Sequence, residues 1–135
     1  MGAPNEINRN LYFTNDHEWI DFQGSVAYVG VCRFKLSGCK EIHKIEFKEV
    51  SDLIKQGEVI SIIHFDDYQV QVHMPVEGKI ISFNDLLLIE ERDVLLQQPE
   101  NIGWISLIVP SELNDKRGLL TTEDYKLRNA MQQIL

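Results

Sequence analysis

Apolar and polar residues alternate along much of the chain, and this alternation predicts short β-strands. Aromatic and β-branched residues on both sides of Gln23-Gly24 predict two antiparallel strands. Residues 42–50, IHKIEFKEV, alternate apolar with charged side chains, which is typical of a half-buried strand. Further strands are predicted within residues 59–65, 79–83 and 103–110.

The stretch IIHFDDYQVQVHMPVEG, residues 62–78, predicts a β-hairpin with Asp66-Asp67 in its turn. The residue pairs that follow from this turn are Phe65–Tyr68, Ile63–Val70 and Ser61–Val72. One face then carries Val59, Ile63, Phe65, Tyr68, Val70, Val72 and Met74, and the other carries His64, Gln69, Gln71 and His73. A shift of one residue would bury three polar side chains, so the alternation predicts a single register.

Helices are predicted in two places. Asn84 is expected to cap a helix through residues 85–96, DLLLIEERDVLL, which ends before Pro99. Thr121 and Asp124 form a capping-box-like start for a helix at the C-terminus. Residues 1–10 are polar and predicted to be a flexible tail, which leaves residues 11–135 as one domain. Many short strands with few helices predict a mainly β sandwich or barrel with peripheral helices.

The charge of the chain narrows the classes of partner. Its 135 residues carry 13 Lys and Arg against 21 Asp and Glu, a formal net charge of −8. An acidic surface repels phosphate groups, so we expect neither nucleic acid nor a membrane as a partner. The longest apolar run, residues 86–89, is far too short to cross a bilayer, and residues 1–10 have no signal-peptide pattern, so the expected location is the cytoplasm. Cys32 and Cys39 lack zinc-ligand spacing and are expected to be free thiols.

Candidate catalytic groups are few. His17 and Glu18 could form an acid–base pair, but neighbours on a strand point to opposite faces, which favours a structural role. His64 and His73, with Asp66 and Asp67, could bind a metal ion, although exposed hairpin histidines are the simpler interpretation. Cys32 has no base visible in the sequence. We therefore expect no enzyme activity and assign no catalytic or metal-binding residue.

Six segments in order give the chain a family resemblance. They are Tyr12-Phe13-Thr14 with His17-Glu18-Trp19, Gly24 to Val31, Glu49 to Asp52 with Gly57-Glu58, Pro75-Val76-Glu77-Gly78, Pro99 to Trp104, and Leu119 to Tyr125. Together they resemble the H protein of the glycine cleavage system, a lipoyl carrier, over residues 11 to 127. The resemblance implies a barrel-sandwich hybrid, lipoyl/biotinyl-carrier-like, with a C-terminal helix.

The resemblance also implies a position for the lipoyl group. In that family a lysine at the hairpin tip holds lipoic acid through an amide. Counting back from Pro75 places Asp67 at that lysine, with Asp66 before it. No lysine lies between Lys55 and Lys79. We therefore expect a divergent member of the family that has no attachment lysine and binds no lipoate or other cofactor.

Three functions remain open from the sequence. The first is a lipoyl-free module that binds a glycine cleavage enzyme or a lipoate-attaching enzyme through the tip, with His64, Asp66, Asp67 and Tyr68 as candidate contacts. The second is a binding module unrelated to glycine metabolism, which uses the hairpin or its polar face. The third is a conventional carrier with another lysine modified, which the chemistry of the tip disfavours.

Overall fold

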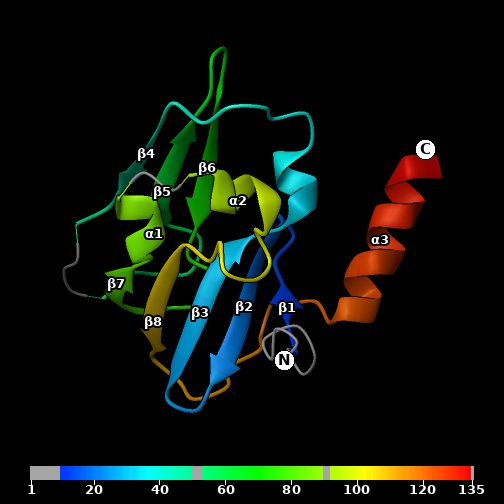
Figure 1. The fold of residues 1–135 in the computed structure, drawn as a ribbon. Helices are drawn as coiled ribbons and strands as arrows, with labels where there is room; N and C mark the ends of the chain where they lie inside the picture. Colours follow the sequence, from blue (N-terminus) through cyan, green and yellow to red (C-terminus); the bar gives the residue numbers. More distant parts are fainter. Residues whose placement is uncertain (1–9, 50–52, 90–91, 135) are drawn as a thin grey trace, which may run out of the picture.

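Two antiparallel β-sheets form the body of the protein (Figure 1). The computed structural model describes residues 10–49, 53–89 and 92–134. One sheet has five strands in the order β1-β2-β3-β8-β7, and the other has three in the order β4-β5-β6. The strands of the five-stranded sheet are β1 Tyr12–Phe13, β2 Glu18–Gln23, β3 Val26–Val31, β7 Gly78–Phe83 and β8 Ser106–Pro110. The strands of the three-stranded sheet are β4 Lys44–Phe47, β5 Val59–His64 and β6 Gln69–His73. A mainly β architecture is therefore confirmed.

The hairpin of β5 and β6 has the predicted register, with Ser61 opposite Val72 and Ile63 opposite Val70. The prediction for Val59 is wrong, because the pairing shifts between Val59 and Ser61. This bulge turns the intervening Ile60 into the core with no exposed surface, and Val59 is only half-buried. Alternation alone cannot reveal an extra residue of this kind.

The hydrophobic core lies between the two sheets. Its fully buried members include Ile20 and Val29 from one sheet and Ile63 and Val72 from the other. In β4, Ile45 and Phe47 are half-buried as predicted, and Val50 lies outside the described residues. Burial of these side chains supplies the main driving force for folding.

The helices are shorter than predicted in the middle of the chain. Asn84 does cap α1, since its side chain accepts a hydrogen bond from the backbone of Leu86 at 3.1 Å. However, α1 spans only Asp85–Leu88, and a separate α2 spans Asp93–Gln97. The single helix over 85–96 is therefore wrong. The two short helices each turn one leucine, Leu87 and Leu95, into the core. None of the described helices has the length and apolar character needed to cross a bilayer.

A second, smaller cluster fastens α3, Thr122–Ile134, to the body. The Thr121 hydroxyl accepts a hydrogen bond from the backbone of Asp124 at 3.1 Å, which confirms the predicted cap. The Tyr125 ring stacks on Phe13 with 4.3 Å between centroids. Phe13 and Leu120 also exchange two backbone hydrogen bonds of 2.8 and 2.7 Å. The helix is thus held by its first turns, and the rest extends away from the sheets (Figure 1).

Candidate functional site

The β5–β6 hairpin projects beyond the rest of the fold and ends in two acidic residues (Figure 1). The backbone N–H of Phe65 donates to the carbonyl of Tyr68 at 2.9 Å, which closes a two-residue turn over Asp66 and Asp67. Both side chains are exposed, that of Asp66 by 73%. The predicted turn is confirmed, and it presents two carboxylates at its end.

The segment that precedes β4 braces this tip. Phe65 is buried, and its ring stacks on Tyr68 with 5.1 Å between centroids. The Tyr68 hydroxyl shares a hydrogen bond of 2.7 Å with the thiol of Cys39, and this bond raises the pKa of Tyr68. His43 contacts the carboxylate of Asp66. Tyr68 was predicted on the core face, yet it is 48% exposed, because the tip extends past the facing sheet.

The two hairpin histidines do not form a common site. His64 contacts Glu46 on the neighbouring strand β4. His73 lies at the other end of the hairpin, where its Nδ1 is 2.8 Å from a carboxylate oxygen of Glu18. Each histidine therefore has its own acidic partner, and the structure does not assemble them with Asp66 and Asp67 as a ligand set.

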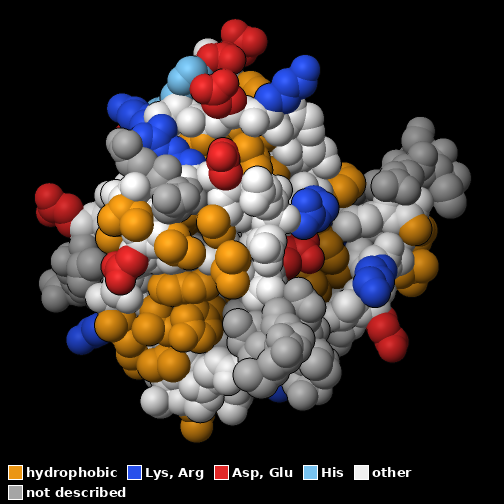
Figure 2. All heavy atoms as spheres, viewed as in Figure 1, with side chains coloured by type: hydrophobic (Ala, Val, Ile, Leu, Met, Phe, Trp, Pro, Cys, Tyr) orange, Lys and Arg blue, Asp and Glu red, His pale blue; other side chains and the backbone are white. Residues whose placement is uncertain are grey.

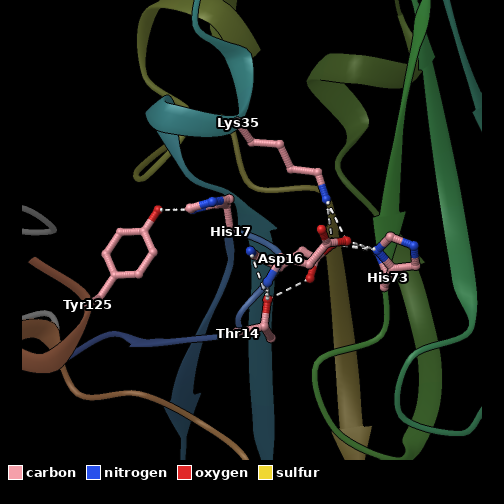
Figure 3. A network of polar contacts seen from close by, with 7 residues as sticks. Thr14, Asp16, His17, Lys35, His73 and Tyr125 are labelled. Carbon is pink, nitrogen blue, oxygen red and sulfur yellow. Dashed lines mark hydrogen bonds and ion pairs between the residues drawn. The ribbon is translucent and has the colours of Figure 1, made fainter. Parts of the chain in front are cut away.

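A buried carboxylate organises a polar network at that other end of the hairpin (Figure 3). The side chain of Glu18 on β2 is 1% exposed, and its carboxylate accepts hydrogen bonds from three kinds of donor. The Thr14 hydroxyl donates to it at 2.7 Å, the Lys35 ammonium at 2.7 Å and the backbone N–H of His73 at 3.0 Å. A buried charge is tolerated when it is paired and hydrogen-bonded in this way.

Asp16 completes the network. Its carboxylate lies 2.6 Å from Nδ1 of His73 and 3.2 Å from the ammonium of Lys35. One ligand-type atom each from Asp16, Glu18 and His73 falls within 4.8 Å of the others, which is the spacing of a small cation site. The Lys35 ammonium already supplies the positive charge there, so a metal ion would have to displace it.

Sequence reasoning missed this network. Its members come from the loop before β2 and the first residue of β2, from the 3-10 helix Arg33–Leu36 and from the end of β6. No motif or regular spacing joins these segments. The sequence signals were His73 on the polar face of the hairpin and Glu18, which was considered only together with its neighbour His17.

His17 and Glu18 belong to different networks, which supports the structural interpretation of this pair. His17 has a φ of 66°, a left-handed conformation that is uncommon outside glycine. Its side chain faces α3, where Nδ1 lies 2.7 Å from the hydroxyl of Tyr125 (Figure 3). Burial lowers the pKa of His17, so the neutral ring is favoured.

Both cysteines are free thiols, as predicted. Cys32 has no exposed surface and packs in the cluster beneath α3. Burial raises the pKa of its thiol to about 12. The thiolate is the nucleophilic form, so Cys32 is unreactive at neutral pH.

We expect alkaline pH to destabilise the fold through Cys32. The pKa of this thiol is 9.0 in the unfolded chain and about 12 in the folded one. The contribution of the neutral thiol to the free energy of unfolding is therefore fully present below pH 9 and is lost as pH rises toward 12. Between these two pKa values the free energy of unfolding falls by at most about 1.4 kcal/mol per pH unit. Urea unfolding between pH 8 and 10.5 measures it. Cys32→Ala should flatten the slope and Cys39→Ala should not, whereas equal slopes in both variants would contradict this.

Comparison with known proteins gives a consistent result. The sequence model of the family described as "Glycine cleavage H-protein" matches residues 11–132. Among curated relatives, the glycine cleavage system H protein of Halothermothrix orenii is 30% identical over 119 residues, which cover 88% of this chain and 92% of the relative. The protein of the same name from Anaeromyxobacter sp. (strain K) is 29% identical over 121 residues, 90% of this chain and 94% of the relative.

The fold also matches a solved structure. The crystal structure of a glycine cleavage system H protein from Mycobacterium marinum superposes with a TM-score of 0.77. The match covers 92% of this chain and 99% of that one at 21% sequence identity. This likeness confirms the barrel-sandwich hybrid fold that the sequence resemblance implied.

Proposed function

Because the chain belongs to the glycine cleavage H-protein family, we propose that it is a member that acts by protein–protein interaction without a lipoyl-lysine of its own. Members of this family are carrier proteins and not enzymes. The observation that carries the proposal is the pair of carboxylates, Asp66 and Asp67, at the apex of the hairpin.

The chemistry of attachment supports this proposal. An amide to lipoic acid requires an amine, and the family position for that amine is taken by Asp67 when the chain is counted back from Pro75. The hairpin contains no lysine that could substitute. Lys55 and Lys79 instead adjoin the bridge between Ile54 and Gly78, which lies at the end of the hairpin away from its tip.

The charge of the tip indicates the chemistry of a partner. Asp66 and Asp67 are exposed, and His64 and Tyr68 flank them. A protein with a basic pocket mouth would be attracted to this surface and oriented by it. The candidate partners are the glycine cleavage enzymes and the lipoate-attaching enzymes, since both must recognise a hairpin tip of this shape in the family's conventional carriers.

Binding measurements against purified glycine cleavage enzymes and a lipoate ligase test the proposal. We expect at least one to bind the wild type, and Asp66→Asn with Asp67→Asn to weaken that binding about tenfold. A matched control removes the same charge elsewhere, through Glu77→Gln with Glu123→Gln at two other exposed acids. Failure of every candidate to bind, or equal loss in the control, would contradict docking through the tip.

A further inference from the structure

The outer edge of β6 carries backbone groups that point away from its own sheet. The hydrogen bond from the Phe65 N–H to the Tyr68 carbonyl fixes the alternation of the β5–β6 pair. Even-numbered residues of β6 therefore direct their N–H and C=O groups toward β5, and odd-numbered residues direct theirs outward. The backbone N–H of His73 agrees with this, because it donates to the carboxylate of Glu18 at 3.0 Å and not to β5.

Gln69 and Gln71 are the other two residues of β6 whose backbone groups point outward. Both are exposed, and the described part of the chain offers their N–H and C=O groups no hydrogen-bond partner. These groups face an open hollow of about 400 Å³ between β6 and the side chains of Asp16 and Lys35. Unpaired backbone groups at the edge of a sheet are a template for another extended chain.

Both edges of the five-stranded sheet are obstructed. The edge strand β1 is bridged by Leu120, which exchanges two backbone hydrogen bonds with Phe13. The edge strand β7 is bridged by Ile54 at Gly78, and a bulge interrupts its pairing farther along. Cover from another segment and bulges of this kind keep a foreign strand from adding to a sheet.

The two edges of the three-stranded sheet differ in charge. At the β4 edge lie the exposed side chains of Lys44, Glu46 and Lys48. Charged side chains, above all lysine, deter pairing at an edge. The corresponding side chains of β6 are the uncharged amides of Gln69 and Gln71. Among the edges that the structure describes, β6 is therefore the one that is open to another strand.

We propose that the outer edge of β6 binds an extended, positively charged segment of a partner protein, which adds to the sheet as a further strand. In an antiparallel arrangement two alternate residues of the segment pair with Gln69 and Gln71 through their backbone N–H and C=O groups. The residue between them lies opposite Val70, on the face of the hairpin that Tyr68 shares. Val70 is half-buried and Tyr68 is 48% exposed, so an apolar side chain at this position extends the packing of the hairpin.

The charge around β6 determines which segment fits. Asp16 lies beside His73 at one end of the strand and is 59% exposed (Figure 3). Asp66 and Asp67 are exposed at the other end, where acidic side chains gather over the hairpin tip (Figure 2). A segment with basic residues on both sides of its apolar residue meets an acid at each end. A second copy of this chain does not fit, because antiparallel pairing of β6 with β6 places the acidic tip of one copy against Asp16 of the other.

An NMR titration with a designed peptide tests strand addition. The probe is acetyl-Lys-Lys-Thr-Val-Thr-Lys-Lys-amide, whose valine falls opposite Val70. We expect the backbone amides of Gln69 and Gln71 to shift most and their hydrogen exchange to slow. The same peptide with both threonines N-methylated keeps its charge but loses two backbone donors, so it should bind about tenfold more weakly. Absence of shifts at Gln69 and Gln71, or equal binding of the two peptides, would overturn the proposal.

A proline at the edge tests the same contact from the side of the protein. The N–H of Gln71 points away from β5, so Gln71→Pro removes an outward donor and leaves the pairing with β5 in place. Gln71→Ala is the matched control, because it removes the same side chain and keeps the N–H. We expect Gln71→Pro to weaken binding of the probe about tenfold and Gln71→Ala to bind it as the wild type does. Circular dichroism checks the fold of each variant. Both variants keep Asp66 and Asp67, so this result is independent of docking through the tip, and equal binding by the two variants would contradict strand addition.

Discussion

Asp67→Lys is expected to gain a single lipoyl group from a lipoate ligase, whereas the wild type is expected to gain none. The substitution places an amine at the apex of a two-residue turn that is already closed by the hydrogen bond between Phe65 and Tyr68. The exposed position leaves that amine free to reach a ligase and to form the amide. Intact-mass measurement after incubation with ligase, ATP and lipoate should show complete addition to the variant and none to the wild type.

The matched control moves the amine by one position. Asp66→Lys has the same charge change in the same turn but points its side chain along a different direction, toward the contact with His43. We expect little or no modification of this control. Lipoylation of the wild type would contradict the absence of a usable lysine. A folded but unmodified Asp67→Lys would show that the tip differs from a carrier's in shape as well as in chemistry.

Lys35→Met is expected to cause the largest loss of stability among single substitutions in the polar network. Glu18 is 1% exposed, and the Lys35 ammonium is the cation that lies 2.7 Å from its carboxylate. Methionine keeps the apolar stem of the side chain and removes only the charge. Breaking a buried ion pair in this way costs about 3–5 kcal/mol. Chemical denaturation at pH 7 measures this loss of unfolding free energy.

Two further variants separate the ion pair from general damage. Lys126→Met removes an exposed lysine on α3 and should change stability by less than about 0.5 kcal/mol. Glu18→Gln added to Lys35→Met replaces the unpaired carboxylate by a neutral amide and should recover part of the loss. A Lys35→Met protein as stable as the Lys126→Met control would mean that Glu18 is neutralised by other groups.

The parts of the fold that local pattern determines were predictable. Alternation placed Asp66 and Asp67 in the turn, because any other register buries glutamine. The caps at Asn84 and Thr121 were also visible, since each depends on one side chain and the backbone of its own helix. The bulge at Ile60 and the separation of α1 from α2 could not be predicted, because both depend on which side chains, Ile60, Leu87 and Leu95, are buried in the core.

The candidate site divides in the same way. The hairpin tip is contiguous in sequence, so its position and charge could be predicted. The network around Glu18 depends on three segments that meet only in the folded chain, and Lys35 lies 17 residues from its partner. The exposure of Ile81 on β7 and Val109 on β8 likewise depends on which side of these strands the core occupies.

The corner where β1 meets α3 also bears on how the protein is made. His17 and Tyr125, which touch there, are 108 positions apart in the chain. Contacts of such long range cannot form until the segment that supplies Tyr125 has left the ribosome. Phe13 therefore lacks the cover of Tyr125 and Leu120 on the nascent chain until that segment has been made. An apolar corner of this kind is exposed on the nascent chain for as long as its partner segment is missing.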